Sequence, residues 1–397
     1  MARILFTWEL GRGFGHLAGY RRAFTLLSEQ GHSILLAVRD LANTERVYGD
    51  TAIPAVQAPI LANRSTEPVV KVCSYAQIMQ NTGFADMPGL LGRVKAWRYL
   101  YDCFRPDLII YDHSPTAMLA YRSRDARQIF CGNGFFLPPL QEPLPAMRYW
   151  ENFSRDDLLA AEQPVLSCIN SVLGTLKEPL LPALWQLFEN MRFIHCTIRE
   201  LDHYPSREGV EYHGILSSGH FGEPPCWPAG TGPRVFGYLY PFQTLPALLQ
   251  WLKESGYPTL IYAPEVSEAV KNSLHSESLH FVGHPLNLHQ VGAGCDLGIT
   301  CGNFVTTANI LLAGKPVLVM PLDLEKYMLG RRVEQLGAGL AAPGLLPAGM
   351  IGKLQALLND ARYRQAAEQF AARYAGGTAE REPEALAEMI ENELFRR

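Results

Sequence analysis

Short apolar runs alternate with segments of helical periodicity from the first residues onward. Ala2–Thr7 is an apolar run, Leu17–Gln30 carries apolar residues on one helical face, and Ser33–Val38 is a second apolar run. Such runs between turn residues are typical of buried strands, and the periodic segments are typical of helices. Further strands of this half are expected at Pro54–Ala58, Asp107–Tyr111, Gln128–Cys131 and Phe193–Thr197. Strands that alternate with helices predict a parallel α/β sheet.

A stretch dense in glycine and proline interrupts this pattern, and a second series of strands and helices follows it. At 397 residues the chain is long enough for two domains. Strands of the second half are expected at Arg234–Tyr238, Thr259–Ala263, Leu279–Val282, Asp296–Thr300 and Val317–Met320. The expected organisation is an N-terminal domain over 1–216, a linker over 217–233, a second domain over 234–375 and a terminal helical segment over 376–397.

Composition narrows the class of protein. The formal net charge is −4 and the sequence contains no long basic run, which argues against a nucleic-acid partner. The eight cysteines include no CxxC pair, so buried reduced thiols are expected rather than disulfides or a zinc site. No signal peptide opens the sequence, and no apolar run reaches the roughly 20 residues that span a bilayer. We expect a cytoplasmic protein, with peripheral contact to a membrane left open.

One stretch of the second half, Asp296–Gly339, combines strand, turn and helix in a way that suits a phosphate ligand. The turn Cys301–Gly302–Asn303 follows a short apolar strand, and Thr306 and Thr307 can cap the helix that begins there. A turn of small residues before a helix leaves backbone N–H groups unpaired at the positive helix end, where phosphate binds. The acidic loop 323–326 follows the next strand and lies beside the group that the phosphate carries. This geometry predicts a sugar-nucleotide site.

The same stretch resembles the donor-binding signature of the GT-B nucleotide-sugar-dependent glycosyltransferases, the relatives of plant and macrolide glycosyltransferases. That signature runs His-Gly-Gly-x-Gly-Thr, then Glu, Gly-x-Pro, Pro and Asp/Glu-Gln. The positions in register are Gly302, Thr306, Gly314, Pro316, Pro321 and Glu325. The positions that depart from it are Cys301, Asn303, Val305, Asn309 and Lys326, in place of His, Gly, Gly, Glu and Gln. The resemblance implies two Rossmann-like α/β domains facing a cleft, with a last helix that packs back toward the first domain.

The resemblance also implies roles for individual residues of the donor site. The donor diphosphate would bind at Gly302, Asn303, Phe304, Thr306 and Thr307. The ribose and base would lie near Asn309, Val282 and His284. The donor sugar would be held by Glu325, Lys326 and Asp323. Plainer interpretations stand beside these: Thr306 as a helix cap, His284 as a turn histidine before proline, and Glu325 with Lys326 as a surface ion pair.

The glycine-rich turn Gly11–His16 after the first strand has two interpretations. A Gly-x-Gly turn with Asp40 after the second strand is a weak sign of a nicotinamide dehydrogenase, but the third glycine of that motif is missing. The turn instead resembles the amino-terminal turn of GT-B proteins, where a glycine-rich loop ends in histidine. The resemblance makes Gly13 and Gly15 part of an acceptor loop.

His16 is the candidate general base. It lies at a helix N-terminus, where the macrodipole disfavours the imidazolium and keeps the ring able to accept a proton. Asp112 ends a different buried strand at the edge where ligands collect, and a carboxylate there can orient the histidine. The resemblance places both residues, because plant-type members pair a histidine after the first strand with an aspartate after the fourth. The plain alternatives are a packing histidine and a strand-end cap.

These features together predict an inverting glycosyltransferase. It would move a sugar from a UDP or dTDP sugar to a hydroxyl of a small-molecule, lipid or glycan acceptor. The histidines show no metal-ligand spacing and no DxD-type motif stands at a strand end, so transfer without a metal ion or other cofactor is expected. One rival is a non-catalytic GT-B-fold binding protein, which the substitutions at 301, 305, 309 and 326 favour. Another is a sugar-nucleotide epimerase or hydrolase, which would need no acceptor.

Overall fold

The chain divides into two compact units, which are described separately. The computed structural model describes residues 1–62, 67–122, 125–216, 222–344, 346–377 and 380–396. The first unit comprises Met1–Thr197, Tyr204–Ser217 and Arg381–Arg397, and the second comprises Ile198–His203 and Ser218–Glu380. Of the expected linker over 217–233, residues 217–221 lie outside the described part of the chain.

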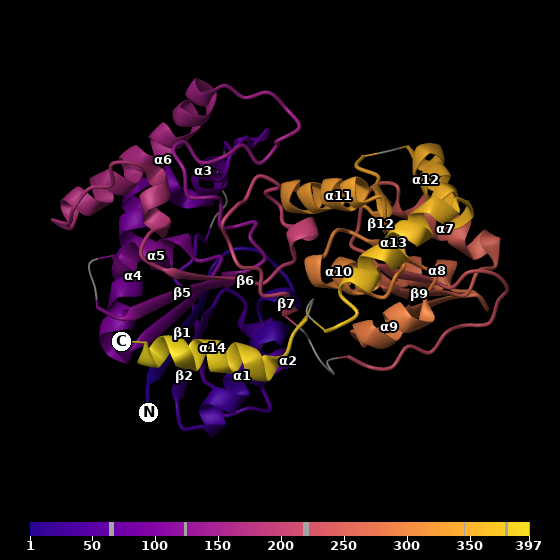
Figure 1. Ribbon diagram of the computed structural model, residues 1–397, viewed down its shortest axis with the longest axis horizontal. Helices are drawn as coiled ribbons and strands as arrows, with labels where there is room; N and C mark the ends of the chain where they lie inside the picture. The colour runs from indigo at the N-terminus through magenta and orange to yellow at the C-terminus, as the bar shows by residue number, and fades with distance from the viewer. Residues whose placement is uncertain (63–66, 123–124, 217–221, 345, 378–379, 397) are drawn as a thin grey trace. The chain divides into compact units, whose positions relative to one another are not determined.

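A six-stranded parallel sheet forms the centre of the first unit (Figure 1). Its strands are β1 (Arg3–Trp8), β2 (Ser33–Val38), β3 (Ala55–Gln57), β4 (Leu108–Asp112), β5 (Arg127–Gly132) and β6 (Arg192–His195). They lie in the order β3-β2-β1-β4-β5-β6, so the first strand is in the middle beside the fourth. The strands expected from the apolar runs are all present, with small shifts at their ends.

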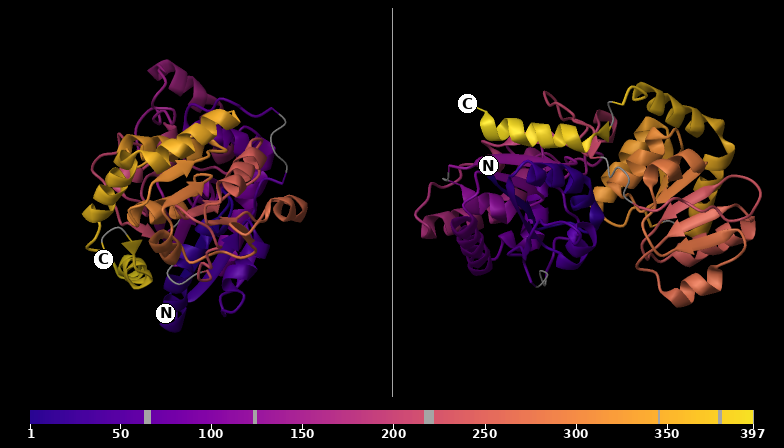
Figure 2. Two further views of the ribbon diagram at one scale, coloured as in Figure 1. Left: turned by 90° about the vertical axis from the view of Figure 1, so that its right-hand side faces the viewer. Right: turned by 90° about the horizontal axis from the view of Figure 1, so that it is seen from below.

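Helices cover both faces of this sheet, because its strands are apolar on both sides. The helices are α1 (Ala18–Glu29), α2 (Leu41–Tyr48), α3 (Tyr75–Met79), α4 (Met87–Phe104), α5 (Pro115–Tyr121), α6 (Arg155–Thr175) and α14 (Pro383–Phe395). Short turns of other helix types are η1 (Phe14–His16), η2 (Gln80–Phe84) and η3 (Leu184–Phe188). Helix α14 packs along α1 (Figure 1), and Figure 2 shows this last helix, in yellow, from two further sides. Helices α4, α5 and α6 form a separate contacting group.

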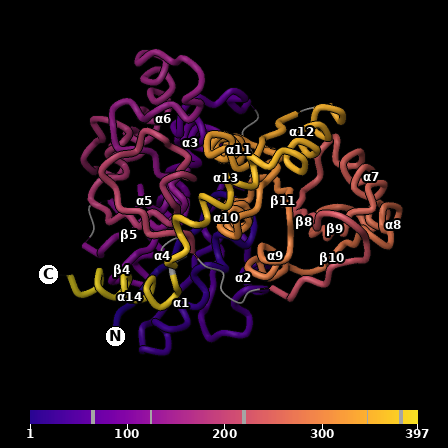
Figure 3. The backbone as a smooth tube through the Cα atoms, turned by 45° about the vertical axis from the view of Figure 1, so that its right-hand side comes forward, coloured from indigo at the N-terminus to yellow at the C-terminus, as the bar shows by residue number. Residues whose placement is uncertain are grey.

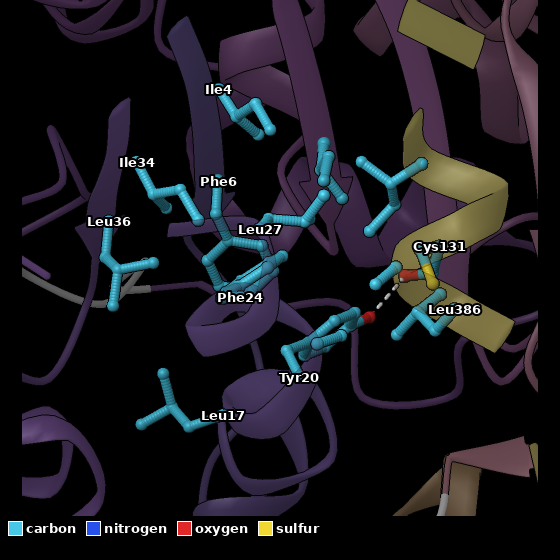
Figure 4. Close-up of a cluster of buried hydrophobic side chains, with 14 of the residues drawn as sticks. Ile4, Phe6, Leu17, Tyr20, Phe24, Leu27, Ile34, Leu36, Cys131 and Leu386 are labelled. Atoms are coloured by element: carbon cyan, nitrogen blue, oxygen red, sulfur yellow. Dashed lines mark hydrogen bonds between the residues drawn. The ribbon is translucent and has the colours of Figure 1, made fainter. Parts of the chain in front are cut away.

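The core between the sheet and α1 is closed by the end of the chain. Phe6 on β1 packs against Tyr20 and Phe24 on α1, with ring centroids 4.9 Å and 5.3 Å apart (Figure 4). Leu386 and Ile390 of α14 belong to the same buried cluster. A segment remote in sequence therefore contributes directly to the core that supports α1.

The second unit repeats the topology of the first. Its strands are β8 (Val235–Tyr238), β9 (Thr259–Tyr262), β10 (Leu279–Val282), β11 (Leu297–Thr300), β12 (Val317–Val319) and β13 (Gly339–Ala341), in the order β10-β9-β8-β11-β12-β13. Its helices are α7 (Leu245–Ser255), α8 (Glu268–Leu274), α9 (Leu288–Gly294), α10 (Phe304–Leu312), α11 (Leu324–Leu336), α12 (Pro347–Asn359) and α13 (Ala361–Arg373), with the turn η4 (Arg199–Leu201) against α11. Helix α12 contacts both α7 and α13 (Figure 3). Apart from the two large sheets, strands β7 (Ile215–Leu216) and β14 (Glu380–Arg381) pair with each other in a small sheet.

The structure departs from the sequence-based expectation in two details. Strand β13 was not expected, because its short Gly-Leu-Ala sequence carries little strand signal and is held by pairing with β12. The helix after β11 begins at Phe304 with Asn303 as its N-cap, so Thr306 and Thr307 lie inside α10 and the prediction that they cap it is wrong. The fold supplies the helix start one turn earlier because the chain turns at Gly302.

Two general features follow from the elements. Among the residues described, none of the helices combines the length and apolar character that a membrane crossing requires. All eight cysteines lie within the described ranges and are free thiols, with Cys103 and Cys226 exposed and the others buried.

Candidate active site

The residues expected to carry the chemistry gather at one edge of each sheet. In a parallel sheet of this order, neighbouring strands lead away in opposite directions at the point between the first and fourth strand, and ligands bind there. In the first unit this point lies between the ends of β1 and β4, and in the second between the ends of β8 and β11. His16 follows β1 and Asp112 ends β4, whereas the turn at 301–303 follows β11.

His16 and Asp112 are joined by a short hydrogen bond. His16 Nδ1 lies 2.6 Å from Asp112 Oδ1, and the two side chains are 16% and 4% exposed. The indole of Trp8, the last residue of β1, stacks on the imidazole with ring centroids 5.2 Å apart. Because Trp8 and Asp112 are paired in register, the sheet places the Trp8 indole and the Asp112 carboxylate side by side. Bonding through Nδ1 favours the tautomer that leaves the Nε2 lone pair as the basic position.

Tyr20 completes this pair, although the sequence analysis did not identify it. Its hydroxyl lies 3.0 Å from Asp112 Oδ2 and 2.9 Å from the Cys131 carbonyl oxygen, and shares its single proton between these two acceptors (Figure 4 draws the latter contact). Burial and the neighbouring Asp112 charge raise the pKa of Tyr20 well above its ordinary value, so the phenol keeps its proton and donates. His16 ends the turn η1 whereas Tyr20 lies on α1, so no helical spacing links the two residues and the sequence offered no signal for Tyr20.

The glycine-rich turn shapes the space around the His16 ring. Gly11 has φ +89°, and a Cβ atom there would lie 2.4 Å from His16 Nε2, so any side chain would displace the ring. Gly13 precedes η1 with φ 88°, whereas Gly15 lies within η1 and a Cβ there would contact nothing within 4 Å. Of the two glycines expected in an acceptor loop, Gly13 is required by backbone geometry and Gly15 is required by neither conformation nor space.

Glu9 supports the segment behind Asp112. Its carboxylate is buried and accepts hydrogen bonds from the backbone N–H groups of Thr116 (3.2 Å) and Ala117 (2.6 Å) at the start of α5. Burial raises the pKa of Glu9 to about 7, against the lowering effect of these hydrogen bonds. The same segment is tied to β1 by a hydrogen bond from Leu10 N to the His113 carbonyl. Glu9 is a second residue that the sequence analysis did not single out.

A second aromatic side chain, besides Trp8, borders the His16 ring. Phe136 lies 5.9 Å from His16 between ring centroids and stacks on His113 at 4.5 Å. The loop that carries Phe136 is held by Arg207, whose guanidinium donates to the carbonyls of Gly134 (3.0 Å) and Leu137 (2.7 Å). Burial lowers the pKa of His113 well below its ordinary value, so this ring is neutral. The His16 ring therefore lies beside an apolar surface whose loop is held by hydrogen bonds.

The turn after β11 leads directly into the N-terminus of α10. Gly302 has φ +85°, and its N–H donates to Thr300 Oγ1 over 3.2 Å. Asn303 and Phe304 lie at the start of α10, where helix N–H groups are unpaired. Thr306 and Thr307 are buried within the helix, and Thr307 Oγ1 bonds Thr300 Oγ1 at 2.9 Å. The Thr307 hydroxyl therefore holds helix to strand.

The expected ribose and base residues lie on separate elements of the second unit, since Asn309 is on α10 after β11 whereas Val282 and His284 are at the end of β10. Asn309 is buried on α10, and its side-chain amide donates to the Val305 carbonyl over 2.9 Å. Val282 ends β10, and His284 in the following loop pairs with Glu223 at 3.0 Å, with both of these side chains well exposed. Sheet order places the end of β10 two strands away from β8, so these residues form the outer part of the edge.

The acidic loop after β12 forms the start of α11. Asp323 is the N-cap, accepting from Lys326 N at 3.1 Å and from Lys326 Nζ at 2.5 Å. Glu325 is half-buried in the first helical turn. Neighbouring carboxylates outweigh burial and raise the pKa of Lys326, so it is a cation. The three expected donor-sugar residues therefore lie on one turn of helix beside Gly302.

Comparison with known proteins identifies the fold that carries these residues. No family model matches the chain, and no curated protein matches its sequence. Among solved structures, the glycosyltransferase VinC in complex with dTDP is 16% identical, with 100% of both chains covered and a TM-score of 0.67. The glycosyltransferase of kitacinnamycin gives a TM-score of 0.70 at 16% identity over 99% of both chains, and the calicheamicin glycosyltransferase CalG4 gives 0.68 at 16% identity over 100% of this chain and 98% of that one. The chain has the two-domain GT-B fold of these glycosyltransferases, as its donor signature predicted.

Proposed function

We propose that this protein is an inverting glycosyltransferase that moves a sugar from a nucleoside-diphosphate sugar, UDP- or dTDP-linked, to a hydroxyl group of a small-molecule, lipid or glycan acceptor. The observation that carries the proposal is the His16–Asp112 hydrogen bond of 2.6 Å at the edge between β1 and β4. The GT-B fold, shared over the full length with proteins named as glycosyltransferases, supports it.

The first unit would supply the base. His16 Nε2 takes the proton of the acceptor hydroxyl while the hydroxyl oxygen attacks the anomeric carbon of the donor sugar. The imidazolium that forms is stabilised by the Asp112 carboxylate, which Tyr20 holds in place. The bond from the anomeric carbon to the diphosphate oxygen breaks on the opposite face, which inverts the configuration.

The second unit would bind the donor. The α10 N-terminus, which follows the Gly302 turn, presents backbone N–H groups to the diphosphate, since a helix N-terminus favours an anion. Glu325, with two acceptor oxygens, suits the hydroxyls of the donor sugar. We expect the transfer to need no metal ion, because the N-terminus of α10 and the Lys326 ammonium can neutralise the charge of the diphosphate leaving group.

A non-catalytic binding protein of the same fold is the second candidate. The observation that favours it is the donor turn, where Cys301 is fully buried and the Asn309 amide is bonded to its own helix. Neither side chain offers the donor the charge that histidine or glutamate would offer.

The test begins with thermal unfolding in the presence of UDP, dTDP, GDP and ADP, their common sugar conjugates, and NAD as control. A ligand that binds the native state raises the unfolding midpoint by mass action. A shift with one nucleotide family, followed by transfer to an acceptor in the presence of EDTA, would support the proposal. Shifts without transfer or donor turnover would favour the binding protein, and a shift with NAD alone would contradict both.

The variants His16→Ala and Glu325→Ala then test the proposed roles of the two units one at a time. His16→Ala should abolish transfer and leave the Kd for the donor largely unchanged, whereas unchanged turnover would remove His16 from the mechanism. Glu325→Ala should weaken the sugar nucleotide more than the bare nucleoside diphosphate. Equal losses for both ligands would place Glu325 outside the sugar site.

A further inference from the structure

Position 301 has a structural role in this protein. The Cys301 side chain is fully buried in the core of the second unit, and Sγ accepts a hydrogen bond from Tyr240 N at 3.3 Å. Burial raises the pKa of the thiol to about 11, so it stays neutral. A buried neutral thiol cannot reach a ligand or carry charge to one. Cys301 instead holds the loop after β8 against the turn after β11.

Tyr240 is the residue that this anchor places at the donor turn. Its hydroxyl lies 3.0 Å from the Tyr238 hydroxyl and accepts a hydrogen bond of 3.5 Å from Asn303 Nδ2. Burial raises the pKa of Tyr238 far above its ordinary value, so Tyr238 keeps a proton that it can donate to Tyr240. Either hydroxyl can donate in the Tyr238–Tyr240 hydrogen bond, and when Tyr238 donates, the Tyr240 proton is available to another acceptor. Tyr240 is only half-buried, so that acceptor can be a ligand.

Lys326 brings a cation to the same turn. A Cβ atom added at Gly302 would lie 2.6 Å from Lys326 Cβ, so the lysine stem crosses directly over the turn. The ammonium bonds Asp323 at 2.5 Å and has two further N–H donors. The Lys326 side chain is 20% exposed.

Building on the proposed function, we infer that Lys326 and Tyr240 together bind the diphosphate of the donor and neutralise the leaving group, in the place of the charge that position 301 does not supply. The Lys326 ammonium pairs with a phosphate oxygen, and the Tyr240 hydroxyl donates to a second one. Lys326 thus acts on the phosphate rather than on the sugar, while Glu325 remains at the sugar hydroxyls.

Calorimetric titration of single variants tests this inference. The ligands are the nucleoside diphosphate found in the unfolding panel, its monophosphate and its sugar conjugate. Lys326→Gln should weaken the diphosphate and the sugar conjugate by the same factor, roughly 10- to 100-fold, because a charge-assisted hydrogen bond is lost. It should change monophosphate binding much less. Tyr240→Phe keeps the ring and should weaken the diphosphate roughly 3- to 10-fold.

Two further variants serve as controls. Lys315→Gln makes the same charge change just before β12, at the amino ends of the strands and away from the donor turn. It should leave all three affinities unchanged. Lys326→Arg keeps the cation and should bind the diphosphate within a few-fold of wild type. It also tests the charge in a folded protein if Lys326→Gln proves unstable.

Each outcome decides between the inference and the proposed function. Wild-type protein that binds no nucleoside diphosphate would overturn both. Wild-type binding with an unchanged Lys326→Gln affinity would overturn the inference alone. A loss confined to the sugar conjugate would place Lys326 at the sugar and also overturn the inference.

Discussion

Asp112→Asn is the sharpest test of the proposed chemistry. The substitution keeps the size of the side chain and an oxygen that can accept from His16 Nδ1, but removes the negative charge. Asp112 is 4% exposed and its Oδ1 is 2.6 Å from Nδ1. With charge centres about 4 Å apart and an effective dielectric constant of about 20, the carboxylate stabilises the imidazolium by about 4 kcal/mol. The loss corresponds to roughly a 10³-fold fall in kcat.

The assay is steady-state transfer with the donor and acceptor that the unfolding panel and the transfer assay identify, together with the Kd for that donor. We expect kcat to fall, the donor Kd to stay within a factor of two or so, and the His16→Ala/Asp112→Asn double variant to match His16→Ala, because Asp112 acts through His16. Asp107→Asn is the matched control, since Asp107 accepts a hydrogen bond from Arg3 N just before the other end of β4. A fall of less than tenfold, or fully additive effects, would refute the coupling.

Three further predictions concern the support of the site. Glu9→Gln should remove a pH dependence of stability. In the wild type the pKa of Glu9 is raised from 4.5 to about 7, so the native state holds the carboxyl proton more tightly than the unfolded state does. The wild-type free energy of unfolding should therefore fall by about 3 kcal/mol between pH 4.5 and 7. Urea titrations at both pH values check this, and parallel curves for variant and wild type would contradict it. Gly11→Ala should displace the His16 ring and lower kcat at least tenfold, with a smaller effect on the donor Kd; wild-type kcat would show that the ring can move without cost. Ile390→Ala should cost about 2–5 kcal/mol in urea unfolding, because this fully buried residue ties α14 to the core, and a loss below about 1 kcal/mol would contradict that role.

Some parts of the fold follow directly from local sequence. Strand Ser33–Val38 was predicted to the residue, because an apolar run between turns leaves little alternative in a buried parallel sheet. Strand β13 was not, because a short run of small residues becomes a strand only when β12 offers backbone partners.

The sequence by itself also predicted that His16 and Asp112 meet, because both follow strands that lead to one edge of the same sheet and because the family resemblance pairs them. Only the tertiary structure decided the roles of Tyr20, Tyr240 and Cys301. Tyr20 reaches Asp112 across 92 positions of sequence, and Tyr240 meets Cys301 across 61. Local patterns carry no information on such contacts, since they depend on which strands lie side by side. The sequence analysis therefore identified the residue types of the site, while the packing of β1 on β4 and of β8 on β11 decided which side chains complete it.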